Sequence, residues 1–419
     1  MATRTVSAAG GNFNATGTWV GGVVPIAGDD IIANATSGNL TLTAASPLLT
    51  GINFSGYTRT LALSTFNLNA NGTITLGAGM TITATTGRLA LGAIGSTLTS
   101  NGVTIPTLSW QYNITLVGDV TVSTALGLSP GVAHTLDVTG GNIIFLGPSI
   151  TINNMKLVSG NKLILRPTST LSLTIGVNGM NGILQIDTTN AITMVGPMRL
   201  DNQVSGNSLE ITQTPNFTTN PKLFYTKSTN NVTSIDSGTY SISFAEILFQ
   251  SNSAATTATL NVNGSAVSVG DLVIEPGGQV STNATTNAII QGTHPFSSIK
   301  SIYCPSYLGW VSGSTALIQR SSDLRLKGGL TYSVSERLLI GGPGTTRSQF
   351  GGLSPSTTNI YFTGFTYSIS SAEFTRVNFT STNVPLNYLN NTNVLVNASA
   401  TGLSLPSGGG GGGSFTFVN

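Results

Sequence analysis

The 14 acidic side chains are the residues best suited to chemistry, because paired carboxylates can cleave glycosidic bonds by acid–base catalysis. Asp29 and Asp30 are the one adjacent pair, but neighbours on a strand point to opposite faces. Asp187 can converge with Asp201 or Glu210 if stacked coils bring residues about 20 positions apart side by side. Such a site would be a carbohydrate cleft. No aromatic side chains cluster with these acids, however, so we assign no catalytic residue and expect a non-enzymatic protein.

Metal and thiol chemistry lack their usual spacings. The two histidines, His134 and His294, lie far apart, and neither belongs to an HxH or HExxH pattern. The single cysteine, Cys304, leaves no partner for an internal disulfide or a cysteine-based zinc site, so we expect a small buried hydrophobe. The glycine-rich segment 341–346 lacks the lysine of a phosphate-binding loop. We therefore expect no metal and no cofactor.

Charge is scarce in this sequence. Charged residues make up 7% of the chain, whereas typical soluble domains carry about 25%. The net charge is +2 and the 16 basic residues are scattered, so we expect no nucleic-acid binding. The densest charge lies between residues 320 and 337, which we interpret as a candidate contact surface or, alternatively, a solvated outer face. Its residues are Arg320, Asp323, Arg325, Lys327, Glu336 and Arg337.

Short apolar–polar alternations with the two-residue period of a β-strand run through the chain. Examples are Leu61-Ala62-Leu63, Ile74-Thr75-Leu76, Leu89-Ala90-Leu91 and Ile114-Thr115-Leu116. Runs this short and frequent suit the flat sides of a parallel β-solenoid, where each strand points one apolar side chain inward. We predict an all-β fold, specifically a right-handed parallel β-helix with an N-terminal cap and a smaller C-terminal β module. An irregular series of β-sandwiches is the alternative.

Changes in composition divide the predicted fold into five segments. Polar gaps and prolines between residues 202 and 235 favour a boundary or an inserted loop there, and aromatic and charged residues become frequent after residue 294. The predicted segments are a cap at 1–30, a β-solenoid at 31–215, a second β-solenoid or β-rich region at 216–292, a C-terminal β module at 293–406, and a glycine-rich tether with a docking strand at 407–419.

The predicted cap contains residues suited to covering the open sheet edge that stacked coils leave. Trp19 offers a large apolar plate, and Pro25 cannot extend a ladder of hydrogen bonds. Asp29 and Asp30 can accept hydrogen bonds from the amides of the bend at this point. No apolar segment follows the N-terminal arginine, and no run of 18 apolar residues occurs. We therefore expect neither a signal peptide nor insertion into a membrane.

A run of six glycines separates an apolar strand-like run from the preceding sequence. The glycines predict a flexible tether. Phe415, Phe417 and Val418 then supply a short strand that can add to an exposed sheet edge. We predict that this strand docks on a neighbouring subunit or on another protein of the same assembly.

The N-terminal segment also carries a family resemblance. Its Trp-x-Gly-Gly-x-x-Pro-x-x-Gly-Asp-Asp motif is followed by threonine-rich runs and resembles the opening of bacteriophage virion structural proteins of the β-solenoid type. The resemblance extends by motif to about residue 90, and beyond that it is one of composition alone. The matching residues are Trp19, Gly21, Gly22, Pro25, Gly28, Asp29 and Asp30.

The resemblance implies a structural component of a phage particle: a tail fibre, a tail-associated appendage or a capsid-surface fibre. Such a protein is assembled in the host cytoplasm and located in the virion, with other virion proteins and a host-surface glycan as expected partners. Low charge and abundant threonine and asparagine suit lateral packing of copies, so we expect a homo-oligomer, favouring a trimer. The matched motif is structural and carries over no catalytic residue. A glycan depolymerase or lyase on a β-helix, and a bacterial surface adhesin, are the alternatives.

Overall fold

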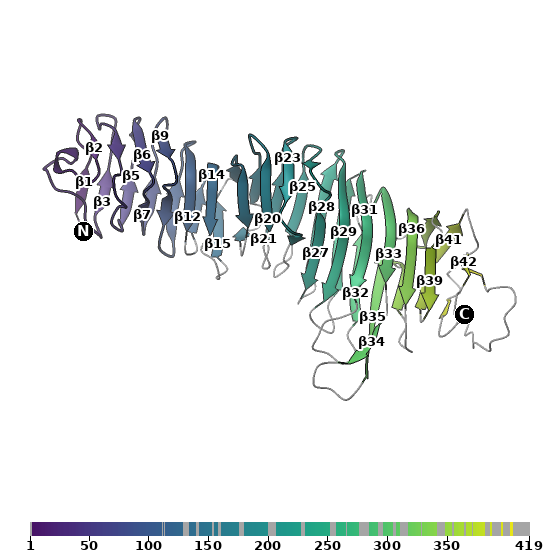
Figure 1. Ribbon diagram of the computed structural model, residues 1–419. Coiled ribbons are helices and arrows are strands. Elements are labelled where there is room, and N and C mark those ends of the chain that lie inside the picture. Colours follow the sequence, from purple (N-terminus) through teal and green to yellow (C-terminus); the bar gives the residue numbers. More distant parts are fainter. Residues whose placement is uncertain are drawn as a thin grey trace. The chain divides into compact units, whose positions relative to one another are not determined.

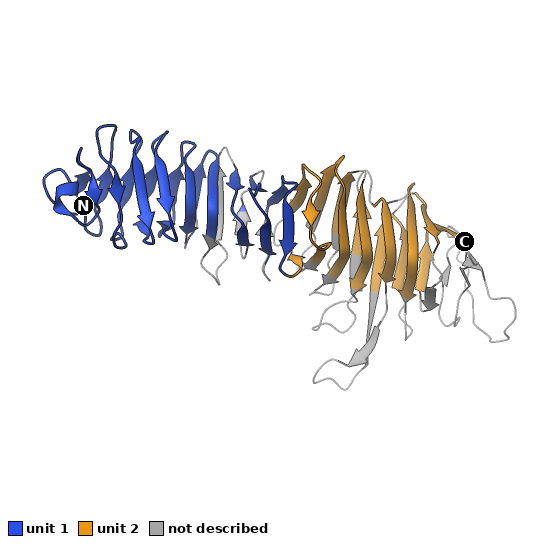
Figure 2. Cartoon of the chain, turned by 45° about the horizontal axis from the view of Figure 1, so that its top comes forward, with its two compact units in different colours: residues 1–195 blue, residues 196–419 orange. Residues whose placement is uncertain are grey.

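The fold is seen in a computed structural model that divides the chain into two compact units, Met1–Val195 and Gly196–Asn419 (Figure 2). The structure describes residues 2–110, 112, 114–128, 134–139, 142–152, 155–157, 161–175, 180–199, 207–227, 231–251, 257–264, 266–275, 285–291, 296–304, 307–310, 317–327, 329–341, 348–353, 356–363, 366–370, 372–381, 386–387, 395–396 and 403–404.

Unit 1 is built from short strands joined in parallel sheets (Figure 1). One sheet has the order β1 (Thr3–Thr5), β3 (Asp30–Ile32), β5 (Gly51–Asn53), β8 (Thr73–Thr75), β11 (Ser96–Thr99), β13 (Ile114–Val117), β15 (His134–Thr139), β18 (Met155–Leu157), β21 (Met180–Asn181). A second has the order β2 (Gly11–Asn12), β4 (Leu40–Thr41), β6 (Thr60–Ser64), β9 (Thr81–Ala84). A third contains β7 (Leu68–Ala70), β10 (Leu89–Leu91), β12 (Thr104–Trp110), β14 (Val120–Leu128), β16 (Ile143–Phe145), β19 (Lys162–Leu165) and β22 (Ile183–Ile186). A fourth contains β17 (Ser149–Ile152), β20 (Leu171–Ile175) and β23 (Ala191–Met194).

The chain of unit 1 passes through its sheets in rotation. Strands β5, β6 and β7 lie in three different sheets, and β8, β9 and β10 return to those sheets in the same order. Each returning strand pairs in parallel with its predecessor, so that Ile52 faces Ile74 and Leu68 faces Leu89. This all-β arrangement of long parallel sheets is compatible with a β-solenoid, and the sequence-based expectation of an all-β fold is confirmed.

Inward-pointing apolar side chains stack into columns in unit 1. Register places one such column on successive strands of the first sheet, and each of its residues is at most 2% exposed: Ile31, Ile52, Ile74, Leu98 and Leu116. Full burial of one Leu or Ile side chain contributes roughly 1.5–3 kcal/mol, so these columns stabilise the stack strand by strand.

Close contact between two chain corners requires glycine at the start of unit 1. Gly10 has a φ of +64°, and a Cβ atom there would lie 2.2 Å from the carbonyl oxygen of Asn39. Any side chain at Gly10 would therefore force these two corners apart. The short 3-10 helix η1 (Thr16–Thr18) follows in the same segment.

Unit 2 also consists of parallel sheets, with longer strands. One sheet contains β24 (Met198–Arg199), β27 (Lys222–Lys227), β29 (Ile242–Ser251), β31 (Val267–Glu275), β33 (Ser298–Cys304), β36 (Thr331–Gly341), β38 (Thr358–Phe362) and β41 (Val377–Ser381), with β39 (Thr366–Ser370) also paired to β36. Another contains β25 (Asn207–Ile211), β28 (Asn231–Gly238), β30 (Thr257–Gly264), β32 (Thr285–Gln291), β35 (Leu317–Leu326), β37 (Ser348–Gly352), β40 (Ala372–Thr375) and β43 (Leu395–Val396). The remaining strands of unit 2 are β26 (Asn216–Phe217), β34 (Tyr307–Trp310), which pairs antiparallel with β35, and the pair β42 (Leu386–Asn387) and β44 (Leu403–Ser404).

From β27 to β33 the chain of unit 2 alternates between its two main sheets. Strand β29 is ten residues long and β36 is 11, so each strand buries several inward side chains. One inward column is fully buried on five neighbouring strands and consists of Leu223, Ile247, Leu272, Ile302 and Leu338. Unit 2 therefore uses the same stacking of apolar side chains as unit 1.

The observed division between the units follows Val195. The sequence-based segment boundaries after residues 30, 215, 292 and 406 stay predictions, and the last two of them lie outside the described residues. In the part of the chain that the structure describes, no helix has the length and hydropathy needed to cross a membrane.

Candidate functional site

The N-terminal segment folds back along the first strand of its own sheet. Strand β1 pairs with β3 on one edge, and residues 18–20 run antiparallel along the other edge. An antiparallel bridge joins Val6 to Trp19, and the Val20 amide donates a hydrogen bond to the Thr5 carbonyl oxygen at 2.8 Å. Because an open strand edge presents unpaired amides and carbonyls to other chains, this pairing protects the end of β1 and the residues after it from unintended strand addition.

Trp19 is fixed by a hydrogen bond from its indole nitrogen and by packing of its ring. Its indole Nε1 donates a hydrogen bond to the carbonyl oxygen of Phe13 at 2.7 Å. The two rings meet edge to face, with centroids 5.1 Å apart and an interplanar angle of 80°, and both residues are buried. Such an aromatic pair adds about 0.5–1.5 kcal/mol beyond its area burial. Pro25, predicted with Trp19 as part of a cap, is buried in the same segment.

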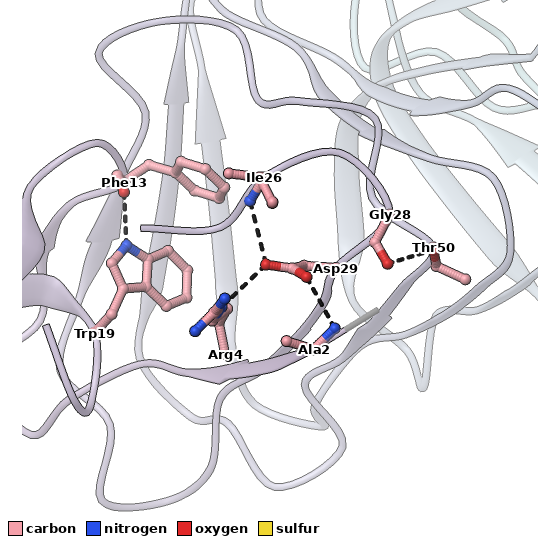
Figure 3. Close-up of polar contacts among 8 residues, drawn as sticks. All are labelled: Ala2, Arg4, Phe13, Trp19, Ile26, Gly28, Asp29 and Thr50. Carbon is pink, nitrogen blue, oxygen red and sulfur yellow. Dashed lines mark hydrogen bonds and ion pairs between the residues drawn. The ribbon is translucent and has the colours of Figure 1, made fainter. Parts of the chain in front are cut away.

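The Asp29 carboxylate ties three parts of this segment together (Figure 3). One oxygen accepts a hydrogen bond from the Ala2 amide at 2.9 Å, and the other accepts from Arg4 Nε at 3.0 Å and from the Ile26 amide at 3.3 Å. The Arg4 hydrogen bond, followed by the backbone donors, holds the pKa of Asp29 below its usual value, although burial acts in the opposite direction. Asp29 therefore carries a negative charge that the surrounding donors stabilise.

Asp30 takes a different position from its neighbour. It lies on β3, half-buried, in register with Thr3 on β1 and Gly51 on β5. A Cβ atom on Gly51 would lie 2.9 Å from Asp30 Oδ1, so the glycine leaves room for this carboxylate. The predicted role of amide acceptor therefore falls to Asp29 among the hydrogen bonds described, and the role of the whole segment as a cap stays a prediction.

Part of the predicted contact surface lies on β35. Asp323 and Arg325 are two residues apart on this strand, and Arg325 Nε lies 2.7 Å from Asp323 Oδ1. The guanidinium of Arg325 also donates to the side-chain oxygen of Gln349 on β37, and the amide nitrogen of Gln349 lies 3.5 Å from Glu373 Oε2 on β40. These contacts form a polar row across three neighbouring strands. Burial, with a smaller contribution from Glu373, raises the pKa of Asp323 against the opposing effect of Arg325.

The remaining residues of that predicted surface are divided between two sheets. Lys327 directly follows β35 and is half-buried, and the Arg320 side chain lies outside the described part of the structure. Glu336 and Arg337 lie on β36, in the other main sheet of unit 2. Glu336 forms an exposed ion pair with Lys300 of β33 at 3.4 Å. The structure thus separates the set into a β35 group and a β36 group, and a contact role for either stays a prediction.

The acids considered for a carbohydrate cleft have separate surroundings. Asp187, in unit 1, accepts hydrogen bonds from Arg166 at 2.6 and 2.8 Å. Glu210 lies on β25 in unit 2, in register with Asp236 on β28. Asp201 lies outside the described residues. The described partners of Asp187 and Glu210 thus differ, and the hypothesis of a cleft built on these acids stays a prediction.

Two carboxylates that the sequence analysis did not single out lie in register in unit 2. Glu246 on β29 is directly opposite Asp271 on β31, and Lys222 on β27 contacts Glu246 at 3.2 Å. In each strand the charged residue precedes three apolar ones, in Lys222-Leu-Phe-Tyr, Glu246-Ile-Leu-Phe and Asp271-Leu-Val-Ile. This repeated pattern was the signal that could have identified the row.

Of the histidines and the cysteine, the structure describes the side chain of Cys304 alone. The backbone of His134 lies on β15, but its side chain is outside the described part of the structure. His294 is outside the described residues altogether. Cys304 is fully buried, its Sγ lies 3.6 Å from the Gln349 carbonyl oxygen, and burial raises its pKa. No group of three or more His, Cys, Asp or Glu residues able to hold a metal occurs within the described ranges.

The predicted docking strand with Phe415, Phe417 and Val418 lies outside the described residues, as does the glycine run before it. The sites that the structure does describe are therefore the Asp29-centred segment of unit 1 and the charged rows of unit 2. Comparison with protein-family models, with curated proteins and with solved structures finds no match to this chain.

Proposed function

We propose that this chain is a structural component of a bacteriophage particle: a tail fibre, a tail-associated appendage or a capsid-surface fibre. In this proposal it is assembled in the host cytoplasm, becomes part of the virion and acts without catalysis as a stiff β-rich support. Its partners are further copies of itself, with a trimer favoured, other virion proteins and a host-surface glycan.

The Asp29-centred segment is the observation that carries the proposal. The motif that resembles phage virion proteins includes Trp19, Gly28 and Asp29. In the structure Trp19 covers Phe13, Asp29 collects three donors, and the Gly28 carbonyl accepts from Thr50 Oγ1 at 3.0 Å. The residues of the motif thus have structural roles, which supports the structural reading of the family resemblance over a catalytic one.

The finer features of the proposed fold follow from the same segment and from general chirality. We assign a right-handed β-solenoid because parallel crossover connections are right-handed in about 98% of cases. The segment before β3 acts as its N-terminal cap, since residues 18–20 pair with the end of β1 and the residues that follow it.

Labelling of particles tests the proposed location. An antibody against the purified chain is applied to particles isolated by density gradient from a culture that produces it, and bound antibody is located with gold by electron microscopy. We expect gold on fibres or other projections of phage particles. Gold on cell surfaces alone would contradict the proposal and favour an adhesin. Release of reducing sugar from host polysaccharide by the wild-type chain would favour a depolymerase.

Removal of residues 408–419 tests the proposed docking strand. The truncated chain should keep the circular dichroism of the full chain, because the deleted residues follow every described strand. Its incorporation into particles should fall, because the strand supplies main-chain hydrogen bonds to a partner sheet edge. Normal incorporation of the truncated chain would contradict this role.

A further inference from the structure

One outward face of unit 2 carries an unbroken apolar column. Register aligns one residue from each of five neighbouring strands, and every one of them is apolar or aromatic and half-buried. The column consists of Phe224, Leu248, Val273, Tyr303 and Leu339, on β27, β29, β31, β33 and β36. Five residues separated by four strand spacings of about 4.8 Å extend over roughly 19 Å.

Alternation along each strand shows that this column points away from the core. Val273, for example, lies between Leu272 and Ile274, which are fully buried. Because successive side chains on a strand point to opposite faces, Val273 must face outward. Strands with near-continuous apolar runs occur in parallel sheets whose two faces are both covered. The inner face of this sheet is covered by the core of unit 2. The apolar column on the outer face therefore favours binding of a further protein surface there.

A row of charged residues lies beside the column on the same face. The residues two positions toward the start of each strand are Lys222, Glu246, Asp271 and Arg337, and the buried Ser301 interrupts this row between the last two. At one end of the column Arg199 lies over the Phe224 ring, 5.4 Å from its centroid. The apolar column therefore has a polar border, which is the anatomy of a protein interface with an apolar core and a charged rim.

We propose that this column is where copies of the chain meet, arranged around an axis parallel to the column. A partner must present a straight apolar line with the same spacing of about 4.8 Å between levels. A second copy offers that line, and rotation about the proposed axis places every residue at the level of its own equivalent. This column would be the interface of the homo-oligomer put forward above, so the inference rests on the homo-oligomeric part of the proposed function.

The distribution of charge fits this arrangement. The charged row lies to one side of the column, so rotation about an axis along the column carries the partner's row to the opposite side. Asp271 of one copy then never meets Asp271 of the next, and the like-charge repulsion that buried interfaces avoid does not arise. A standard interface buries roughly 800 Å² per partner, which is more than one column supplies, so the charged row takes part as its rim.

Engineered cysteines test the arrangement directly. Val273→Cys and Leu248→Cys are each made separately, and disulfides are formed with copper(II)–phenanthroline: two complexes take one electron each as two thiols lose their protons and join. Disulfide formation needs Cα atoms about 4.4–6.8 Å apart, so it reports residues that face their own copies. The natural Cys304 is buried and its pKa is raised, which keeps it out of the reaction.

We expect covalent dimers on a non-reducing gel for both cysteine variants. Val117→Cys is the matched control, because Val117 is an exposed valine on β13 of unit 1 and should stay monomeric on the gel. Crosslinking at one of the two levels alone would overturn the proposed axis. Absence of crosslinking at both levels, in a wild-type protein that sediments as an oligomer, would overturn the interface and leave the proposed function standing.

A charge-introducing pair provides a second readout that needs no disulfide. Val273→Lys should raise the concentration at which the oligomer dissociates at least tenfold in sedimentation equilibrium, whereas Val117→Lys should leave it unchanged. Circular dichroism of each variant checks that the strands remain folded. If wild-type protein sediments as a monomer at every concentration, both the interface and the homo-oligomeric part of the proposed function are overturned.

Discussion

Units 1 and 2 bury similar apolar columns, but one outward column of unit 1 carries threonines whereas one outward column of unit 2 carries apolar side chains. On one sheet of unit 1, three neighbouring strands present Thr73, Thr97 and Thr115 outward in register, and the hydroxyl groups of Thr73 and Thr97 lie 3.1 Å apart. On one sheet of unit 2, the equivalent outward positions include Leu248 and Val273. Inward columns build the stack in both units, so the outward columns are where the two surfaces acquire different uses.

The difference also has an energetic side. Threonine hydroxyls can bond to water or to one another, so this outward threonine column of unit 1 is satisfied in solvent. Apolar side chains on the outward face of unit 2 gain about 25 cal/mol for each square ångström that a partner removes from water. A hydroxyl face therefore favours an isolated surface, whereas an apolar one favours association.

The largest expected effects come from the shared inward columns. Leu272→Ala in unit 2 and Ile74→Ala in unit 1 each remove a fully buried side chain and should destabilise the fold by about 2–5 kcal/mol. Urea unfolding followed by circular dichroism measures the shift in midpoint. The matched outward variants, Val273→Ala and Thr97→Ala, should shift it far less. A small effect of Leu272→Ala would show that unit 2 does not depend on its inward column as unit 1 does.

These inward columns are also the part of the fold that the sequence predicts best. Alternation predicts strands at Leu61-Ala62-Leu63 and Leu89-Ala90-Leu91, and both lie in observed strands, β6 and β10. Which strands pair with one another is harder to predict from the sequence, because a run of three residues carries no information on which distant run lies beside it. Coil length also varies along the chain, so no fixed spacing identifies the neighbouring strand.

The candidate sites show the same limit more sharply. The charged residues between 320 and 337 are close in sequence, yet the turn containing Gly329, with a φ of +78°, carries the chain from one sheet to the other. Asp29 was expected to accept local amides and does so from Ile26, whereas its contact with Ala2 joins residues 27 positions apart. Local patterns thus predict local hydrogen bonds, and contacts between coils need the register.

The Asp29 carboxylate is the next largest expected effect and is specific to unit 1. Asp29→Asn removes the charge that Arg4 contacts, so amide hydrogen exchange at Ala2 and Ile26 should become faster while unit 2 is unaffected. Asp30→Asn is the control, because its carboxylate lies beside Gly51 and outside this set of contacts. Equal acceleration in both variants would show that Asp29 has no special role.

Acid should reproduce the effect of Asp29→Asn. The folded pKa of Asp29 lies below its ordinary value of 3.8, so its contribution is fully present above that value. The contribution is lost as the pH falls below 3.8 and through the lowered folded pKa. Exchange at Ala2 and Ile26, corrected for its intrinsic pH dependence, should therefore rise in this window in the wild type and stay flat in Asp29→Asn. A flat wild-type profile would contradict the assignment.

The smallest expected effects on folding come from exchanging the outward chemistry of the two units. Thr97→Leu in unit 1 and Leu248→Thr in unit 2 each change a half-buried outward side chain and leave the inward column intact. Measured on the monomer, below the dissociation concentration, both should lie within about 0.5 kcal/mol of the wild type in urea unfolding. Association should respond differently, because Leu248→Thr removes an apolar contact between copies and Thr97→Leu removes none. Equal weakening of association by both variants would show that outward chemistry does not separate the two units, and the comparison would then rest on strand length alone.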